Sequence, residues 1–122
     1  GTAREKIGRA FAKTGSSADK PLRASLLIAV VAVHRPSSKA PEWEQDAVAS
    51  GVAHVLSLLL DEAGWGVIWR TGDPTRKKKV AKAHKLTKNE KLMGWLYVGG
   101  IPEKTKPGKK DRLNLEKHLT SL

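Results

Sequence analysis

The residues best suited to hold a ligand follow a short apolar segment in the middle of the sequence. Residues 67–69 predict a buried strand, and Arg70, Thr71 and Gly72 come directly after it. Polar side chains and a glycine at the end of a strand are typical of positions that bind ligands. We therefore expect a binding site where this strand ends.

A long apolar helix must position that strand. Residues 47–60 read AVASGVAHVLSLLL, with only two serines and one histidine among apolar residues. A surface helix normally has one apolar stripe and one polar face. The helix predicted from Trp43 to Glu62 should therefore be enclosed by its own domain and by a second subunit. Gly64 and Gly66 end it, because glycine tolerates the left-handed conformation found at helix ends.

Small side chains form a track along this helix at Ala47, Ser50, Gly51 and His54. Such a track allows another helix to approach closely. Tight packing within the chain and a dimer contact explain it equally well, and both interpretations stay open. For His54 we favour a packed core or interface position over a catalytic role.

The remaining elements are predicted on both sides of this helix. A helix is expected over residues 3–13, a central strand covered on both faces over 26–33, and a third strand over 93–98. His34 follows the strand 26–33. It could be a ligand or a proton carrier, but a solvent-facing side chain is favoured at a strand end.

The second half of the chain carries helix-start signals and most of the positive charge. Asp73 and Pro74 predict the start of a basic helix that continues to about His84. Thr87 and Glu90 have the spacing of a capping box, which predicts another short helical turn. Residues 112–119 could form a final short helix or an arm that reaches across a partner.

Composition limits the classes of protein to consider. A chain of 122 residues suits one domain, and the absence of cysteine excludes disulfides and thiolate chemistry. No apolar run reaches the roughly 18 residues that a membrane span needs. A cytoplasmic location is compatible with these features.

The charge balance raises the question of nucleic acid. The formal net charge is +11, and the basic residues concentrate in 76–91 and 104–117. Such a surface attracts polyanions. Only 5% of the residues are aromatic, so base-stacking platforms are not apparent. Solvated basic faces are the favoured interpretation, and a basic nucleic-acid or polyanion-binding module is the alternative.

Motifs for catalysis by side chains are missing from the sequence. It contains no His-x-x-x-His pair, no Gly-x-Ser-x-Gly elbow and no phosphate-binding P-loop. If the protein is an enzyme, a bound cofactor is expected to carry the chemistry.

Several segments, in this order and spacing, resemble the flavin-dependent nitroreductase family, and in particular its compact single-domain bacterial members. Besides the small-residue helix, they are residues 22–28 (LRASLLI), 41–46 (PEWEQD), 64–72 (GWGVIWRTG) and 91–102 (KLMGWLYVGGIP). The resemblance covers roughly residues 22–102.

The resemblance implies a fold and an activity. The fold is α+β, a three-layer α/β/α sandwich with a central mixed sheet, in an obligate homodimer with one FMN at each of two interface sites. The activity is that of an FMN-dependent NAD(P)H oxidoreductase. Hydride passes from the nicotinamide to flavin N5, and then, by a ping-pong route, to a nitroaromatic or quinone in the same vacated site.

The resemblance also implies which residues bind the cofactor. Trp69, Arg70 and Thr71, with Gly72, match the segment that borders the isoalloxazine ring. Lys110 and Arg112 match a Lys-x-Arg pair that approaches the FMN phosphate. Because these two lie two residues apart, an extended segment would project them to the same side.

One family feature is not found. The N-terminal motif with arginine and serine that grips the ribityl and phosphate groups is absent, so residues 1–122 are expected to form a single nitroreductase-like domain that starts after it. The sequence is then a fragment, lacks preceding residues, or belongs to a flavin-free degenerate nitroreductase-like subunit.

Overall fold

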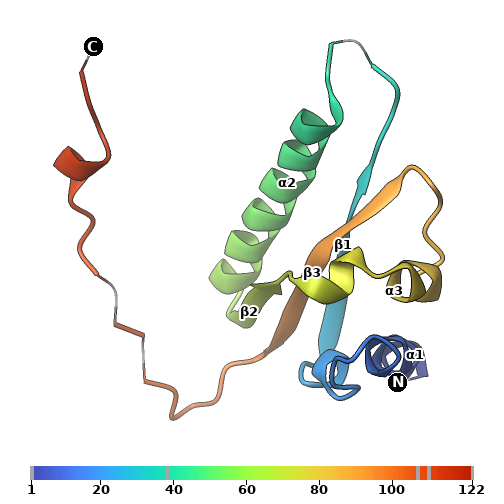
Figure 1. Ribbon diagram of the computed structural model, residues 1–122. Helices are drawn as coiled ribbons and strands as arrows, with labels where there is room; N and C mark the ends of the chain where they lie inside the picture. The colour runs from blue at the N-terminus through green and yellow to red at the C-terminus, as the bar shows by residue number, and fades with distance from the viewer. Residues whose placement is uncertain (1, 38, 107, 110, 122) are drawn as a thin grey trace.

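The computed structural model describes residues 2–37, 39–106, 108–109 and 111–121 (Figure 1). Three strands, three α-helices and three short 3₁₀ segments follow one another in these residues. In chain order they are α1 (Thr2–Ala12), η1 (Lys20–Leu22), β1 (Leu26–Val33), α2 (Glu42–Glu62), β2 (Trp65–Arg70), η2 (Asp73–Arg76), α3 (Lys78–Ala83), β3 (Glu90–Gly100) and η3 (Leu115–Lys117).

The three strands form one sheet in the order β1-β3-β2. Both pairings are antiparallel, so the expected mixed sheet is not what the described residues form. The reason is the position of β3. The helix α2 connects β1 to β2, which leaves these two strands parallel to each other, but β3 lies between them and runs against both.

The central strand is β3, not β1 as the sequence predicted. Its residues Leu92, Trp95, Leu96 and Val98 are all buried, whereas Leu26 and Val33 at the ends of β1 are about half exposed. The apolar run of β1 had suggested coverage on both faces. The longer apolar run of β3 occupies the middle position instead.

Helices α1 and α3 cover one face of the sheet (Figure 1). Their side chains Phe11 and Val80 pack with Trp95 and Tyr97 of β3 in the main hydrophobic cluster. The ring of Phe11 meets the indole of Trp95 edge-on, with centroids 5.1 Å apart. Leu27, Ala29 and Val31 of β1 point to this face, so the alternate residues of β1 point to the face on which α2 lies.

The helix α2 lies on that opposite face and is far less covered. Ala53 is its only buried residue among those described. Exposed large apolar side chains follow the helix from end to end: Trp43, Val48, Val52, Val55, Leu58 and Leu59. The expectation that the chain's own domain encloses this helix is therefore wrong, because one three-stranded sheet covers only one side of it.

Two local predictions in the basic region fail. The predicted helix 73–84 breaks at Lys77, whose extended backbone separates η2 from α3. The side chain of Glu90 accepts a hydrogen bond from the backbone N–H of Thr87, as in a capping box. No helical turn follows, because Glu90 already pairs with Val33 as the first residue of β3.

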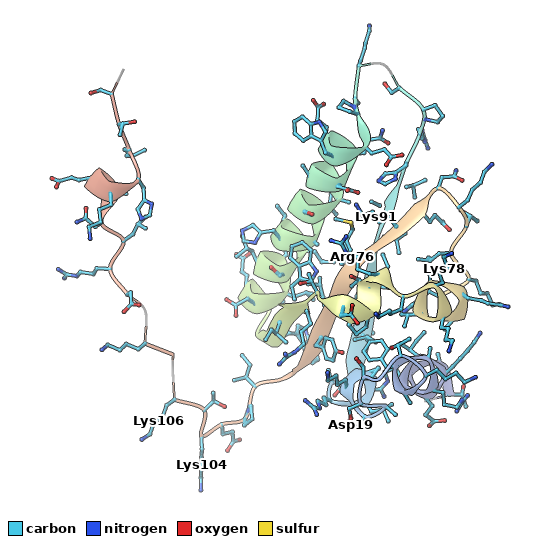
Figure 2. The ribbon with its side chains drawn as sticks, in the orientation of Figure 1. Asp19, Arg76, Lys78, Lys91, Lys104 and Lys106 are labelled. Atoms are coloured by element: carbon cyan, nitrogen blue, oxygen red, sulfur yellow. The ribbon has the colours of Figure 1, made fainter. Side chains whose placement is uncertain are left out.

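The tail after β3 extends away from the sheet and helices (Figure 1), and every described residue from Ile101 onward is exposed. Lys104 and Lys106 lie on this arm (Figure 2). Although α2 has 21 residues, no helix among the described residues is apolar and long enough to cross a membrane.

Candidate flavin-binding site

The end of β2 opens into a cavity of about 700 Å³ between α2, β3 and η2. Three of the residues expected to bind a ligand, Trp69, Thr71 and Gly72, line it. This volume lies within the roughly 300–1,000 Å³ that is typical of small-molecule sites. The cavity contains both signs of charge, since Asp46 and Asp73 line it together with Arg76 and Lys91. Arg76 and Lys91 lie in the region between α2 and η2 (Figure 2).

The fourth of these residues, Arg70, lies on the other face of the sheet. Arg70 pairs with Trp95 in the register of β2 and β3, whereas Trp69 pairs with Leu96. Successive side chains of a strand point to opposite faces. Arg70 therefore lines clefts on the α1 side together with Arg23 and Tyr97, and it does not line the cavity of Trp69.

The indole of Trp69 lies close against Gly94 of β3. A Cβ atom at Gly94 would come within 2.7 Å of Trp69 Nε1 and 2.5 Å of the Arg70 carbonyl oxygen. Gly94 also has φ +136°, a conformation that other residues rarely adopt. Only glycine therefore lets the end of β2 approach β3 this closely.

The indole N–H of Trp69 is buried without a hydrogen-bond partner among the described residues. Buried polar groups usually have partners, and each exception calls for a reason. In this structure the N–H lies against Gly94 of β3.

A bulge in the sheet shapes the wall of this cavity. Val30 of β1 pairs with Gly94 and Val31 pairs with Leu92, so Met93 is an extra residue in β3. Met93 lines the cavity. Bulges often lie beside active sites, where they redirect a side chain.

The turn after β2 is fixed by Gly72. Its φ of +108° suits glycine, and its carbonyl oxygen accepts hydrogen bonds from the backbone N–H and the hydroxyl of Thr75, at 3.0 and 2.7 Å. An ion pair between Lys77 and Asp73 spans the same turn. The backbone that borders the cavity is thus held in one conformation.

Asp46 joins three elements at the edge of the cavity. One carboxylate oxygen is 2.8 Å from His34 Nε2, and the other accepts a hydrogen bond from Lys91. The hydrogen bond from Lys91, supported by that from His34, lowers the pKa of Asp46, so its carboxylate stays ionised. The His34 side chain is only 13% exposed, and the solvent-facing position expected for it is wrong, because α2 brings Asp46 against it.

The two residues expected to bind phosphate, Lys110 and Arg112, belong to the C-terminal tail. Lys110 lies outside the described residues. Arg112 is exposed on the extended tail, and none of the cavity-lining residues comes from that tail.

The sheet, the long apolar helix and the cavity at the end of β2 can be compared with those of known protein families. The sequence model of the Nitroreductase family matches residues 2–100 of this chain. The chain belongs to the nitroreductase family.

Individual relatives agree with this assignment. The proteins named "Putative NAD(P)H nitroreductase YdjA" in Escherichia coli K12 and in Escherichia coli O157:H7 are each 35% identical to this chain over 79 residues. The matched part is 65% of this chain and 43% of each relative, so it spans less than half the length of these curated relatives.

A solved structure shares the fold. The crystal structure of a nitroreductase-like family protein from Bacillus cereus superposes on this chain with a TM-score of 0.82. The two sequences are 20% identical, and the match covers all of this chain and 69% of the other.

Sequence reasoning missed Gly94, Asp46 and Arg76 as residues of the site. Gly94 carried a usable signal, since a glycine inside an apolar strand often marks a bulge or a close backbone approach. Asp46 carried no comparable signal. Its contact with His34 and Lys91 depends on how α2 crosses the sheet, which no local pattern predicts.

Proposed function

We propose that this chain is part of an FMN-dependent NAD(P)H oxidoreductase that reduces nitroaromatics or quinones. Membership of the nitroreductase family supports the class of enzyme. The observation that carries the proposal for this chain is the cavity lined by Trp69, Thr71 and Gly72, at the end of β2. Residues 1–122 act in this proposal as a single nitroreductase-like domain, in the cytoplasm.

The residues present fit a flavin ring. Trp69, Thr71 and Gly72 would hold it, because they combine an aromatic side chain, a hydroxyl and a glycine backbone around one cavity. Gly94 keeps that wall closely packed. Bound flavin supplies hydride transfer from the nicotinamide to the second substrate, and the chain's own residues orient the reactants and exclude water.

The charged residues of the cavity suit a reactant that changes charge during reduction. The ionised Asp46 holds Lys91 and His34 in fixed positions. Arg76 makes no ion pair among the described residues and can therefore hold an anionic group of a substrate or cofactor. Arg112 and Lys110 of the tail are proposed to bind the FMN phosphate.

We also propose that two copies of the chain form a homodimer through α2, which completes the three-layer α/β/α sandwich. The accessible surface is 9,650 Å², whereas a compact monomer of this mass exposes about 6,500 Å². Part of the excess is the extended tail and part is the apolar side of α2. A dimer that covers both accounts for the difference, with an interface above the roughly 2,000 Å² of obligate dimers.

The small-residue track supports the dimer over internal packing. A Cβ atom at Gly51 would meet no atom within 4 Å, so packing inside the chain does not require glycine there. Close approach by a partner helix remains as the reason for it. His54 is exposed on the same helix, which suits an interface position.

The visible absorption spectrum of the protein, purified from its complete reading frame, tests the cofactor. Flavin bands that are lost on removal of FMN and restored on its addition are expected. A colourless protein that FMN does not reconstitute would favour the flavin-free alternative. For the polyanion alternative we expect only weak, non-selective nucleic-acid binding that disappears near physiological salt, and tight selective binding there would reverse the ranking.

A further inference from the structure

A second cleft lies on the face of the sheet opposite the proposed flavin cavity. It has a volume of about 400 Å³ and is lined by β2, the end of β3 and the segment before β1. A smaller recess of about 120 Å³ adjoins it, and Arg23, Arg70 and Tyr97 line both. Lys20 lines the recess. Three basic side chains therefore surround one connected space.

Two of these basic groups retain capacity for a ligand. Arg70 makes no ion pair among the described residues. Arg23 donates from Nε and Nη2 to one oxygen of Asp19, at 3.1 and 2.9 Å, and this contact leaves its Nη1 available. Three positive charges and one carboxylate leave a net charge of about +2 at the site, which a dianion would balance.

The phenol of Tyr97 lies close enough to Arg70 and Arg23 for both charges to affect its pKa. Tyr97 is 7% exposed. Burial raises the pKa of its hydroxyl, and the nearby charges of Arg70 and Arg23 oppose that increase. The hydroxyl therefore stays protonated at neutral pH and can donate a hydrogen bond to an anion beside both guanidinium groups.

The rest of the cleft suits the organic part of a ligand. Its floor is formed by Gly66, Gly99 and Gly100, with Ile68 beside them. A Cβ atom at Gly66 would lie 3.3 Å from the Gly99 carbonyl oxygen, so a larger residue would fit tightly there. Ile68 is 49% exposed and offers an apolar contact for a ring or chain.

From this arrangement we propose that the cleft is a second binding site, which takes the phosphate monoester group of a small organic ligand. Arg23, Arg70 and the hydroxyl of Tyr97 bind the phosphate oxygens, since a planar guanidinium presents paired donors to such an anion. Lys20 adds charge from the recess. The organic part lies along Ile68 and the glycine floor. This site does not depend on flavin binding in the cavity of Trp69.

Calorimetric titration of the flavin-saturated protein with phenyl phosphate tests the proposal. Arg70→Gln and Arg23→Gln should each weaken binding by about tenfold or more, the loss expected for a charge-assisted hydrogen bond. Tyr97→Phe should weaken it by a few-fold. Arg35→Gln is the matched control, because it removes the same charge beyond the opposite end of β1, outside both cavities, and should leave the affinity within about twofold. Benzoate, a monoanion, should bind more weakly than phenyl phosphate.

Three outcomes would overturn the proposal. Equal weakening by Arg70→Gln and Arg35→Gln would mean diffuse attraction by a basic surface. Unchanged phenyl phosphate affinity in a folded Arg23→Gln variant, whose side chain is largely exposed, would remove the site even if Arg70→Gln did not fold. Loss of FMN affinity in both variants, with phenyl phosphate binding only to flavin-free protein, would assign the cleft to the flavin's own phosphate.

Discussion

On one face of the sheet, Phe11 of α1, Val80 of α3 and Trp95 of β3 are 2% exposed or less. On the other face Leu96 and Val98 of β3 are also buried, but Ala53 is the only buried residue of α2 itself. The difference begins in the sequence. The helix α1 has apolar residues on one side, which the sheet covers completely, but α2 is apolar nearly all round. The closed face supplies the stability of the single chain. The open face keeps its apolar surface for a partner and carries the proposed flavin cavity.

The largest expected effect is on the free energy of unfolding, which a substitution should lower far more on the closed face than on the exposed side of α2. Phe11→Ala removes a buried ring from the closed face and should lower the free energy of unfolding by about 3–5 kcal/mol. Val52→Ala on the exposed side of α2 should change it by less than about 0.5 kcal/mol in the unassociated chain. Urea denaturation at low protein concentration measures both. Similar losses for the two variants would contradict the comparison.

Glycine substitutions make a second matched pair. Gly94→Ala places a Cβ against the Arg70 carbonyl and the Trp69 indole at a positive φ, and should destabilise by about 1–3 kcal/mol. Gly51→Ala meets no atom in the chain and should stabilise by about 0.5–1 kcal/mol, because alanine favours the helix. Thermal unfolding distinguishes the signs. A neutral Gly94→Ala would show that the close packing of β2 on β3 is not needed.

The tail provides a prediction about the cofactor. Arg112→Ala should weaken FMN binding by about 1.5–3 kcal/mol, the range for hydrogen bonds to charged groups. Riboflavin lacks the phosphate and should bind the wild type and the variant alike. Equal FMN titration curves for the two proteins would leave Arg112 as an ordinary surface charge.

The smallest expected effect is the pH dependence of stability that comes from His84 on the closed face. His84 Nε2 accepts a hydrogen bond from the Trp95 indole at 3.0 Å. Burial, with a smaller contribution from the charge of Lys6, lowers the pKa of His84. The unfolded chain therefore takes up this proton more readily, so the contribution of His84 to stability is present above its ordinary pKa of 6.5 and is lost as the pH falls below that value.

Denaturant titrations at pH 7.5 and about pH 5 measure this dependence. His84→Gln should reduce the loss of stability on acidification. A wild-type protein with the same decline as His84→Gln would show that His84 does not titrate with unfolding.

Local sequence patterns predicted the elements better than their arrangement. The strand 26–33 and the long apolar helix appear at the expected positions, since both depend on residues close in sequence. The order of strands was not predicted, because it depends on β3 entering between β1 and β2 from more than sixty residues after the start of β1. The same applies to Asp46 and Lys91, which are brought together by the crossing of α2 over β3.

The candidate site was predicted in part. Trp69, Thr71 and Gly72 line one cavity, whereas the alternation of side chains along β2 directs Arg70 to the opposite face. That alternation could have been applied to the sequence. The close packing at Gly94 could not, because the contact with Trp69 depends on the register of two paired strands.

The proposed homodimer requires a partner that covers the exposed side of α2. Sedimentation of the wild type and Gly51→Leu, with detection of both protein and flavin absorbance, tests this directly. Leucine at position 51 projects into open space in the single chain, so it should disturb only a partner helix. We expect a flavin-carrying dimer for the wild type, and a joint loss of dimer and flavin for Gly51→Leu. A stable monomer that carries flavin in the wild type would contradict the account.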